Sequence, residues 1–491
     1  MIRPKTRGTE LTKLANLVAG TATGDVTIFG ITHDSRAVQP GDLYVALLGA
    51  NNHGIDFVGE AIANGAVAVA SDSHGIQVAK EKDIPLLELP NARQDMAKLA
   101  ASVYGNPETK LVLTGVTGTN GKTTTTHMLR SIFLDAAKNV GVIGTLGTYL
   151  GDDHLPGART TPESTDLYAT LALMVERGIT HVFMEVSSHA LALHRVAGIK
   201  FDVAVFTNLT QDHLDFHGSM ENYFAAKALL FTPEFSKQAV ICTNDAWGQK
   251  LAADCEIPNI TLGSDGSWIT SQATSDSSGM TSLQIILDKS ESVFLSVNML
   301  GSYNATNAAC ALAASQILGL ELADCLESLK NVRPIPGRLE NVSIKSTGTV
   351  IVDYAHTPDA VETVLTVIRD ANPAKLITVI GCGGDRDALK RPLMGRVAAH
   401  LSDIVIITDD NPRSENPSAI RSSMIAGANG MPAELIEIAD RRTAIAKALT
   451  LANPGDVIAI LGKGHETGQE IAGEVFEFDD RVVAMQESEN V

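Results

Sequence analysis

The sequence contains few cysteines and few aromatic residues for a chain of 491 residues. Phe, Trp and Tyr together make up 4%, and the five cysteines have no paired spacing. A disulfide framework or a zinc site would need such pairs, so neither is indicated. We expect reduced thiols, in the core or at incidental positions. The cysteines are Cys242, Cys255, Cys310, Cys325 and Cys382.

Long apolar runs are also missing. A membrane-spanning helix needs roughly 18 or more consecutive apolar residues, and the sequence has no such stretch. Residues 1–10 carry three basic side chains, but the apolar core and cleavage site of a signal peptide do not follow. We therefore expect a cytoplasmic protein without stable membrane insertion.

Positive charge is scarce. The chain has 38 Lys and Arg against 57 Asp and Glu, which gives a net charge of −19. Long-range repulsion then excludes non-specific binding to nucleic acid or to an anionic membrane. Anionic small molecules would have to be bound locally, by backbone amides, by a few basic side chains and by metal ions.

The composition is that of a folded protein, with 44% hydrophobic and 19% charged residues. The length predicts several domains. Short β-branched runs alternate with helix-like stretches from Leu111 onward, and a second such series follows Pro334-Ile335-Pro336-Gly337, a plausible hinge. The runs lie at 111–116, 139–143, 180–186, 201–206, 238–242, 349–352, 376–380, 403–407 and 457–461.

This alternation predicts an α/β fold of three domains. Residues 1–108 form a small mixed α/β domain, and 109–337 form a central domain with a parallel sheet. Residues 338–491 form a Rossmann-like doubly wound domain. The Ser-, Thr- and Gly-rich segment 264–282 is expected to be an exposed hairpin or loop.

The strongest local signal is a glycine-rich loop at 115–124, directly after the apolar run Leu111-Val112-Leu113. Strand, glycine loop and helix form the context of a phosphate site, in which backbone N–H groups face the phosphates. Lys122 supplies charge there, and Thr123 can ligate magnesium. The general pattern has glycine where this chain has Val116, so the loop is a variant.

Other candidate residues are ambiguous when taken alone. Glu185 follows the run at 182–184, at a strand end where a magnesium ligand is useful but where a solvated carboxylate is common. His213 could be a capping histidine, and Lys227 lies in a serine-capped helix where a lysine is ordinarily on the surface. Two asparagines at the start of an alanine-rich helix could be mere caps. They are Asn304 and Asn307.

Three loops of the last domain follow three apolar runs, at 381–391, 409–413 and 462–466. All three therefore lie at carboxyl ends of strands, where a doubly wound sheet forms its crevice. Their mixed charges suit a zwitterionic amino acid. The residues concerned are Arg391, Asp410, Asn411, Arg413 and Glu466.

The loop Thr117-Gly118-Thr119-Asn120-Gly121-Lys122-Thr123 resembles that of the Mur ligases and of their relative folylpolyglutamate synthase. Further segments extend the likeness to the Mur ligases along nearly the whole chain, in one order. They are His33-Asp34-Ser35-Arg36, Thr160-Thr161-Pro162, Met184-Glu185-Val186-Ser187-Ser188-His189, Asp212-His213-Leu214-Asp215, Asp353-Tyr354-Ala355-His356-Thr357-Pro358, Gly381-Cys382-Gly383-Gly384-Asp385-Arg386, Asp410-Asn411-Pro412-Arg413 and Gly462-Lys463-Gly464-His465-Glu466.

The resemblance implies a nucleotide site and two magnesium ions. Lys122, Glu185, His213 and Lys227 would be the catalytic residues, and Lys227 would be carbamylated to N6-carboxylysine, which turns a cation into an oxygen ligand. The implied metal ligands are Thr123, Glu185, His213 and the carbamate of Lys227. The implied ATP-binding residues are Gly118, Thr119, Asn120, Gly121, Lys122, Thr123, Thr124, Asn304, Asn307, Arg338 and Asp353.

Two further sets are implied. One would bind a UDP-linked substrate: His33, Ser35, Ala50, Asn51, Asn52, Thr160, Thr161, Ser187 and Arg195. The other would bind an amino acid: Arg391, Asp410, Asn411, Pro412, Arg413, Gly462 and Glu466. The chain departs from the family at Arg159, where asparagine is common, and at Leu193, where a polar residue is usual.

The activity implied by the resemblance is ATP-dependent ligation of an amino acid, meso-diaminopimelate, to the γ-carboxylate of D-glutamate in UDP-N-acetylmuramoyl-L-Ala-D-Glu. The partners are then these small molecules, and we expect a monomer that binds no nucleic acid. Folylpolyglutamate synthase is an alternative, although the first 108 residues count against it. A second alternative is a P-loop switch or motor, which would hydrolyse ATP without an acid or an amine.

Overall fold

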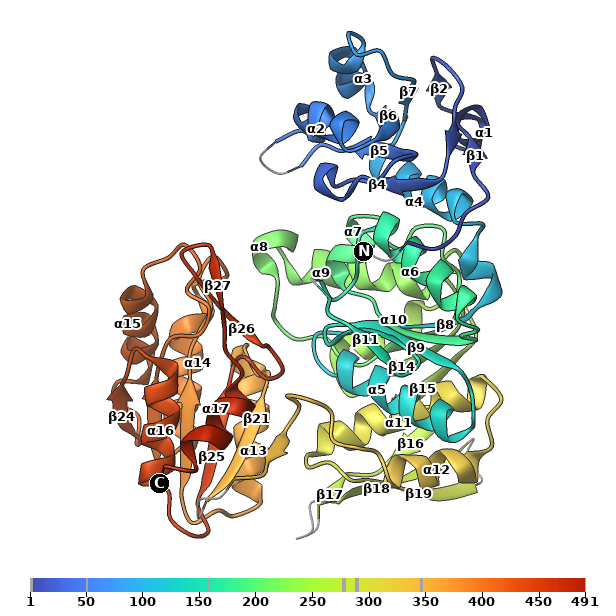
Figure 1. Cartoon of the computed structure of the whole chain (residues 1–491). Coiled ribbons are helices and arrows are strands. Elements are labelled where there is room, and N and C mark those ends of the chain that lie inside the picture. The colour runs from blue at the N-terminus through green and yellow to red at the C-terminus, as the bar shows by residue number, and fades with distance from the viewer. Residues whose placement is uncertain are drawn as a thin grey trace.

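The computed structural model describes residues 3–49, 52–157, 159–275, 280–287, 291–344 and 348–490. Its strands form three large sheets, each within one of the three predicted ranges. The first part lies against one end of the middle part, and the third part lies beside the middle part (Figure 1). The predicted three-part α/β fold is confirmed. In the part of the chain that is described, no helix is long and apolar enough to cross a membrane.

The first part contains a five-stranded sheet in the order β2-β7-β6-β5-β4. Strands β4 to β7 are parallel, and β2 is antiparallel to β7. Helix α4 packs its apolar side chains against helix α6 of the middle part, so one hydrophobic core continues through both parts. The elements are β2 (Thr21–Ala22), β4 (Gly30–Thr32), β5 (Asp42–Ala46), β6 (Ala66–Ser71), β7 (Leu86–Glu88), α2 (Val58–Ala63), α3 (Ser73–Ala79), α4 (Ala92–Val103) and α6 (Ser164–Glu176).

The middle part is built on a twelve-stranded sheet with a parallel centre, β9-β12-β8-β13-β14-β15-β16. Its buried strands are rich in Val, Ile and Phe, as expected for a sheet covered on both faces. Every run predicted as a strand here overlaps one. The strands are β8 (Val112–Thr117), β9 (Val140–Gly144), β12 (His181–Glu185), β13 (Phe201–Phe206), β14 (Ser236–Cys242), β15 (Asn259–Gly263) and β16 (Trp268–Thr270).

The prediction of an exposed hairpin or loop at 264–282 is wrong in part. Strand β16 pairs with β15 and with β18 (Thr281–Leu287), so the segment extends the large sheet. Trp268 is buried there among core side chains. The polar composition concealed this because the strand is only three residues long and the residues on either side of it are largely polar. Residues 276–279 lie outside the described residues.

Helices α5 (Lys122–Asp135), α11 (Ser302–Ile317) and α12 (Leu322–Lys330) cover one face of the middle sheet. Helix α11 is almost entirely buried, and its alanines allow close packing against α5. This packing brings the start of α11 beside the glycine loop that precedes α5. The positions of both helices therefore depend on the same layer of core side chains.

The third part contains a six-stranded sheet, β20-β21-β25-β22-β23-β24, in which only the edge strand β20 is antiparallel within the described residues. Helices α13 to α15 cover one face, and α16 and α17 cover the other. The elements are β20 (Glu340–Val342), β21 (Thr349–Asp353), β22 (Leu376–Ile380), β23 (Ile404–Ile407), β24 (Glu434–Glu437), β25 (Val457–Leu461), α13 (Pro358–Asp370), α14 (Lys390–Leu401), α15 (Pro417–Ala428), α16 (Arg441–Leu451) and α17 (Asp480–Glu487).

Arg441 and Asp480 form a fully buried ion pair between α16 and α17, with both side chains 0% exposed. Two parallel hydrogen bonds of 2.8 Å join the guanidinium to the carboxylate. Arg441→Met should lower the free energy of unfolding by about 3–5 kcal/mol, because it leaves a buried carboxylate unpaired. Urea unfolding followed by circular dichroism measures this change. Lys13→Met, which breaks the exposed pair of Lys13 and Glu10, should change little, and equal effects would contradict the prediction.

Candidate active site

The glycine loop connects β8 to α5 as the sequence predicts. Gly121 precedes the first residue of α5 with a φ of 85°, a left-handed conformation that glycine adopts without strain. A side chain at Gly121 would also collide with the side-chain oxygen of Asn307. The loop and the start of α11 are therefore in close contact, and the N-terminus of α5 points its free N–H groups into the loop.

Lys122 is turned back onto this loop. Its Nζ donates hydrogen bonds of 3.0 and 2.9 Å to the carbonyl oxygens of Gly118 and Thr119. Burial lowers the pKa of Lys122, and the carboxylate of Glu185 opposes that effect. A phosphate group would offer the same ammonium stronger, charged acceptors.

Glu185 ends β12 and is 1% exposed. It accepts a hydrogen bond of 2.9 Å from the hydroxyl of Thr123, and bonds from the N–H and hydroxyl of Thr145. Arg338 donates to the same Thr123 hydroxyl at 3.0 Å. The strand end thus brings a carboxylate and a hydroxyl oxygen together beside the phosphate loop.

Lys227 lies in α9 (Met220–Ala228) and is 1% exposed. Its Nζ donates 2.8 Å to the carbonyl of Gly118 and lies 4.7 Å from the centre of the Tyr223 ring. Burial and the nearby charge of Lys122 lower the pKa of Lys227 well below its ordinary value. A lowered pKa increases the fraction of this lysine in the neutral amine form, which is the form that can react with carbon dioxide.

His213 lies at the start of α8 (Leu214–His217), in a left-handed conformation with φ of 53°. Its Nε2 is 3.4 Å from the carboxylate of Asp212. Burial lowers the pKa of His213 to about 4, against the raising effect of Asp212. The imidazole is therefore neutral at pH 7, as a metal ligand must be.

Within the described part of the chain, no three His, Cys, Asp or Glu side chains are grouped as a metal site. Magnesium prefers oxygen ligands and keeps several waters, so it does not need such a group. The hydroxyl of Thr123 and the carboxylate of Glu185 are 2.9 Å apart, and neighbouring ligands of an octahedral magnesium ion are about 3 Å apart. This pair fits a magnesium ion.

A cavity of about 320 Å³ lies between the glycine loop, α11 and the start of the third part. Asp353 at its wall accepts hydrogen bonds from Leu339 N at 2.7 Å and Ala355 N at 2.8 Å. Burial raises the pKa of Asp353, and Arg338 opposes the shift. Most residues predicted to bind ATP line this cavity: Asn120, Gly121, Thr124, Asn304, Asn307, Arg338 and Asp353.

Asp359, in the first turn of α13, joins the third part to the glycine loop. One carboxylate oxygen accepts from Asn120 Nδ2 at 3.1 Å and from Thr210 Oγ1 at 3.2 Å. Sequence reasoning missed this residue, because an acidic side chain in the first turn of a helix is expected on electrostatic grounds alone.

Three of the residues predicted to bind the UDP-linked substrate converge at the end of β12. The hydroxyl of Thr161 donates 2.8 Å to the carbonyl of Glu185, and Ser187 N donates to that hydroxyl at 3.1 Å. Arg195 donates to Thr161 O at 3.2 Å and is 2.9 Å from the carboxylate of Glu163. Glu163 also pairs with Arg159, the residue that departs from the family.

Thr160 of that set is a neighbour of Thr161 in the middle part, and the other five residues lie in the first part. His33 Nδ1 is 3.1 Å from Thr165 Oγ1 of the middle part. The hydroxyl of Ser35 is bonded to Glu60 at 2.5 Å, so it is engaged internally. Asn52 is exposed, whereas Ala50 and Asn51 lie outside the described residues.

A larger cavity, of about 630 Å³, lies between the middle and third parts. It brings Thr160 and His213 of the middle part opposite the loops at the carboxyl ends of β22, β23 and β25. The carboxyl ends of parallel strands are where the sequence places the amino-acid site. The predicted amino-acid-binding residues that line it are Asp410, Asn411, Arg413, Gly462 and Glu466.

Arg413 is fixed on this wall by the hairpin of β26 (Gly468–Ile471) and β27 (Glu474–Glu477). Its N–H donates to Glu470 O at 3.0 Å, and its carbonyl accepts from Ala472 N at 2.8 Å. The guanidinium donates to Glu470 Oε2 at 3.1 Å and to Gly384 O at 2.7 Å. A guanidinium has five N–H donors, so three remain for a ligand.

Arg391 occupies a different place from the one predicted. It is 5% exposed in the first turn of α14, and its guanidinium donates 2.7 Å to Glu415. The described residues that line the larger cavity include Arg386 of the loop at 381–391, and they do not include Arg391. Pro412, also predicted to bind the amino acid, is not among the described residues that line this cavity.

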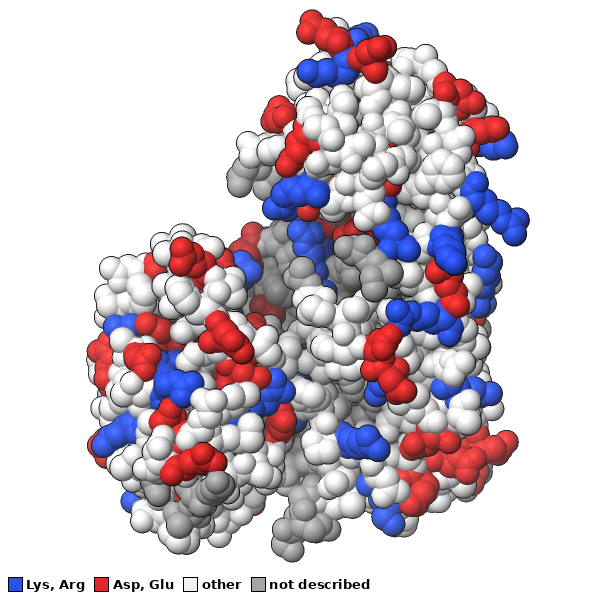
Figure 2. Space-filling model, viewed as in Figure 1, with Lys and Arg blue, Asp and Glu red and all other residues white. Residues whose placement is uncertain are grey.

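The surface around these cavities is mixed in sign despite the net charge. Acidic and basic side chains are interspersed over the face shown in Figure 2. The glycine loop borders one cavity, and a second lies between the middle part and a separate doubly wound sheet, an arrangement typical of an α/β enzyme that uses a nucleotide.

Family models match all three parts of the chain. The Mur ligase family, catalytic domain, matches residues 27–104, the Mur ligase middle domain matches 116–315, and the Mur ligase, glutamate ligase domain matches 337–464. The chain belongs to the Mur ligase family.

Relatives of similar length share two fifths or more of the sequence. The UDP-N-acetylmuramoyl-L-alanyl-D-glutamate–2,6-diaminopimelate ligase of Streptomyces avermitilis is 44% identical over 484 residues, covering 97% of this chain and 95% of that protein. The enzyme of the same name from Geobacillus thermodenitrificans is 43% identical over 472 residues, covering 94% and 95%.

Solved structures show the same fold. A UDP-N-acetylmuramoyl-L-alanyl-D-glutamate–2,6-diaminopimelate ligase superposes with a TM-score of 0.65 at 31% identity, covering 94% of this chain and 95% of that one. Folylpolyglutamate synthase of Mycobacterium tuberculosis has a TM-score of 0.62 at 18% identity and covers 74% of this chain and 91% of its own. Folylpolyglutamate synthase therefore resembles this chain in fold, and it covers a smaller share of this chain than the diaminopimelate ligase does.

Proposed function

We propose that this protein uses ATP to join meso-diaminopimelate to the γ-carboxylate of D-glutamate in UDP-N-acetylmuramoyl-L-Ala-D-Glu. One observation carries the proposal: the 630 Å³ cavity has middle-part residues on one side and Arg413 and Glu466 on the other. An acid activated beside the phosphate loop would there face an amino acid bound by the third part. The relatives named above carry this activity in their names.

In the first step, an oxygen of the substrate γ-carboxylate attacks the γ-phosphorus of ATP, and ADP leaves. The product is an acyl phosphate. Lys122 would neutralise charge on the transferred phosphoryl group, and the N–H groups at the start of α5 would bind the other phosphates of ATP. We assign adenine and ribose contacts to the cavity lined by Asn304, Asn307 and Asp353.

In the second step, the amine of diaminopimelate attacks the acyl carbon, and phosphate leaves after a tetrahedral intermediate. The amine must arrive with its lone pair directed at that carbon, so positioning by the third part contributes much of the rate. Asp410 and Glu466 would bind ammonium, and Arg413 a carboxylate. We assign to Arg386, which lines the cavity, the role that the sequence gave to Arg391.

Magnesium would supply positive charge on the phosphate oxygens during both steps. Thr123 and Glu185 would hold one ion, and His213 with a carbamate on Lys227 would hold a second. The UDP-linked substrate would be bound by the first part, within residues 1–108, and by Thr160, Thr161, Ser187 and Arg195. ATP and nucleotide-linked precursors are cytoplasmic, and we place the enzyme there.

The test of this function is phosphate release from ATP with each substrate omitted in turn. Release should require both the dipeptide nucleotide and diaminopimelate, and mass spectrometry should show the nucleotide product enlarged by one diaminopimelate residue. Rapid ATP turnover without either substrate would instead support a P-loop switch or motor.

Lys227→Ala should reduce activity roughly 10²–10³-fold, because it removes the proposed carbamate ligand. Short carboxylic acids such as formate or acetate should restore part of the activity by placing a carboxylate where the carbamate would be. The measurement is initial rate of phosphate release against acid concentration, with all substrates present.

The matched control is Lys122→Ala, which lacks an ammonium rather than a carboxylate and should not respond to the same acids. Intact-protein mass spectrometry under native conditions in bicarbonate should show wild type, but not Lys227→Ala, heavier by one carbon dioxide. An unmodified wild type, together with no rescue, would rule out the carbamate.

A further inference from the structure

Lys463 is a fully buried lysine behind the wall of the larger cavity, next to the lining residue Gly462, with its side chain 0% exposed. It lies in the loop after β25, between Gly462 and Gly464, each with a positive φ. A buried ammonium is costly unless oxygen atoms surround it. The oxygen atoms in contact with Lys463 therefore show which groups its charge holds in place.

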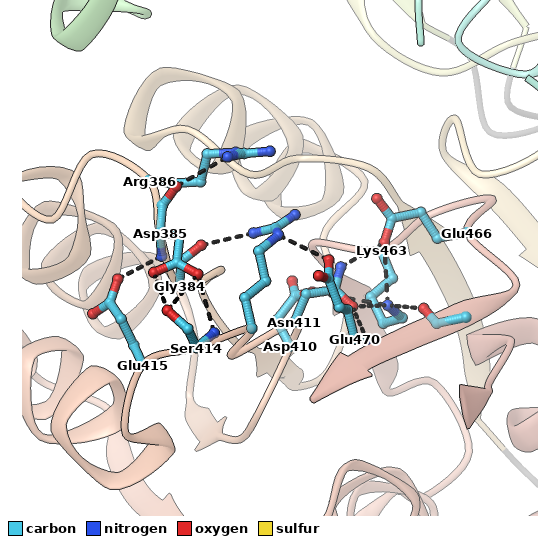
Figure 3. Close-up of polar contacts among 12 residues, drawn as sticks. Gly384, Asp385, Arg386, Asp410, Asn411, Ser414, Glu415, Lys463, Glu466 and Glu470 are labelled. Atoms are coloured by element: carbon cyan, nitrogen blue, oxygen red, sulfur yellow. Dashed lines mark hydrogen bonds and ion pairs between the residues drawn. The ribbon is translucent and has the colours of Figure 1, made fainter. Parts of the chain in front are cut away.

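All three N–H donors of this ammonium are used. Nζ donates to Asn411 Oδ1 at 3.1 Å, to Glu466 Oε2 at 3.1 Å and to the carbonyl of Gly468 at 2.6 Å. Asp410 Oδ1 is 3.9 Å away. Figure 3 shows Lys463 among Asp410, Asn411 and Glu466, and its acceptors come from two segments, the loop at 409–413 and the stretch 466–468.

The orientation of the Asn411 amide follows from these contacts. Its oxygen accepts from Lys463 and from Glu470 N at 3.0 Å, so its NH₂ group must face the other way. That group donates to Glu466 Oε2 at 2.8 Å. Glu466 Oε2 thus accepts two hydrogen bonds from inside the protein, and its second oxygen remains for a ligand.

Lys463 also connects this pair to the element that fixes Arg413. Gly468 begins β26, and the same strand contains Glu470, whose backbone and side chain both contact Arg413. The ammonium of Lys463 therefore bonds both to Glu466, on the anionic side of the cavity wall, and to β26. That strand supports Arg413, on the cationic side.

We propose that Lys463 is a positioning residue for the amino-acid substrate: it sets the orientation of Asn411 and Glu466 and the register of β26, and so the spacing between ammonium-binding and carboxylate-binding groups. It does this from behind the wall, without touching the ligand. This inference rests on the proposed function, because it takes diaminopimelate as the occupant of the cavity.

Lys463→Met keeps an unbranched side chain one atom shorter and removes all three donors. Loss of hydrogen bonds from a charged group should misplace Asn411 and Glu466 and weaken substrate binding. We expect KM for diaminopimelate to rise about 10- to 100-fold. KM for ATP and for the dipeptide nucleotide should stay within about twofold, because their sites lie on other walls. Lys463→Arg, which retains a cation, should recover part of the loss.

Arg369→Met is the matched control in the same domain. Arg369 also donates to a carbonyl, that of Leu401, and to a carboxylate, that of Asp403, but these precede β23, at the amino end of the strand whose carboxyl end carries a cavity loop. It should lower the melting temperature without raising KM for diaminopimelate. If Lys463→Met only lost stability, it too would have a lower melting temperature and an unchanged KM for diaminopimelate. The selective rise in KM for diaminopimelate is therefore the deciding measurement.

A double-mutant cycle with Glu466→Gln tests whether Lys463 acts through Glu466. If it does, the effects on KM for diaminopimelate should be strongly non-additive, the double variant being no more than about threefold worse than the poorer single variant. Effects that multiply, or a rise in all three KM values together, would overturn the proposal.

If Lys463→Met does not fold at the assay temperature, the same cycle with Lys463→Arg decides the question. The failure of the proposed function would look different. In that case wild type itself would release no phosphate in response to diaminopimelate, whereas failure of this inference leaves wild-type activity intact and only the selective KM change absent.

Discussion

Replacing Lys122 by alanine should lower kcat for phosphate release roughly 10³-fold or more. The ammonium lies at the start of α5, where the charge on a transferring phosphoryl group would be greatest. Burial lowers the pKa of Lys122, and a bound phosphate should raise it again by stabilising the ammonium. Alanine cannot supply that positive charge. Steady-state phosphate release with saturating substrates measures the loss.

Lys200→Ala is the control, since Lys200 is exposed on the same domain. Circular dichroism and the melting temperature should show that both variants remain folded. Turnover of Lys122→Ala close to that of wild type would contradict the ATP-site assignment, whatever the result for the other substrates.

Arg413 should determine which amino acid is used. Meso-diaminopimelate differs from lysine by a second carboxylate, which a guanidinium can bind with two parallel hydrogen bonds. Lysine would leave Arg413 without that partner, so kcat/KM should favour diaminopimelate by roughly 10⁴-fold. Arg413→Ala should remove most of this preference while leaving KM for ATP nearly unchanged.

The structure strengthens this expectation. Glu470 and the Gly384 carbonyl already hold the guanidinium, and β26 pairs with the backbone of Arg413 on both sides. Less side-chain freedom is then lost when the substrate binds. Arg442→Ala, on the exposed face of α16, is the control. Equal kcat/KM for diaminopimelate and lysine in wild type would overturn the specificity but not the ligase activity.

The sequence predicted the strands of the middle and third parts well, because buried parallel strands are nearly continuous apolar runs. It also placed Glu185 and the Asp410 loop at strand ends, where order along the chain fixes position in the fold. These features depend on local pattern and on the topology of parallel sheets.

Features that depend on contacts between distant segments were harder to predict. Taken by itself, the helix of Lys227 reads as ordinary surface, yet Lys227 is buried because the Gly118 loop closes over it. Spacing alone likewise did not show which arginine of the loop at 381–391 faces the cavity. The start of α14 turns Arg391 towards Glu415 and leaves Arg386 at the cavity.

Lys463 was passed over for a related reason. The resemblance implies its neighbour Gly462, and a strand-end loop is expected to expose a polar group such as Glu466, whereas a fully buried ammonium is rare. The distant residue Asn411 joins the nearby Glu466 and Gly468 around the ammonium, and this arrangement shows why a lysine is tolerated there.

The single carboxylate oxygen of Asp359 that accepts from both Asn120 and Thr210 makes separation of the middle and third parts an all-or-none event at that point. Two hydrogen bonds with net values of about 0.5–1.5 kcal/mol each would favour the joined state by a factor of roughly 5 to 150. Because Asn120 belongs to the glycine loop, nucleotide binding to that loop and separation of the third part would be coupled equilibria, each shifting the other by the same factor.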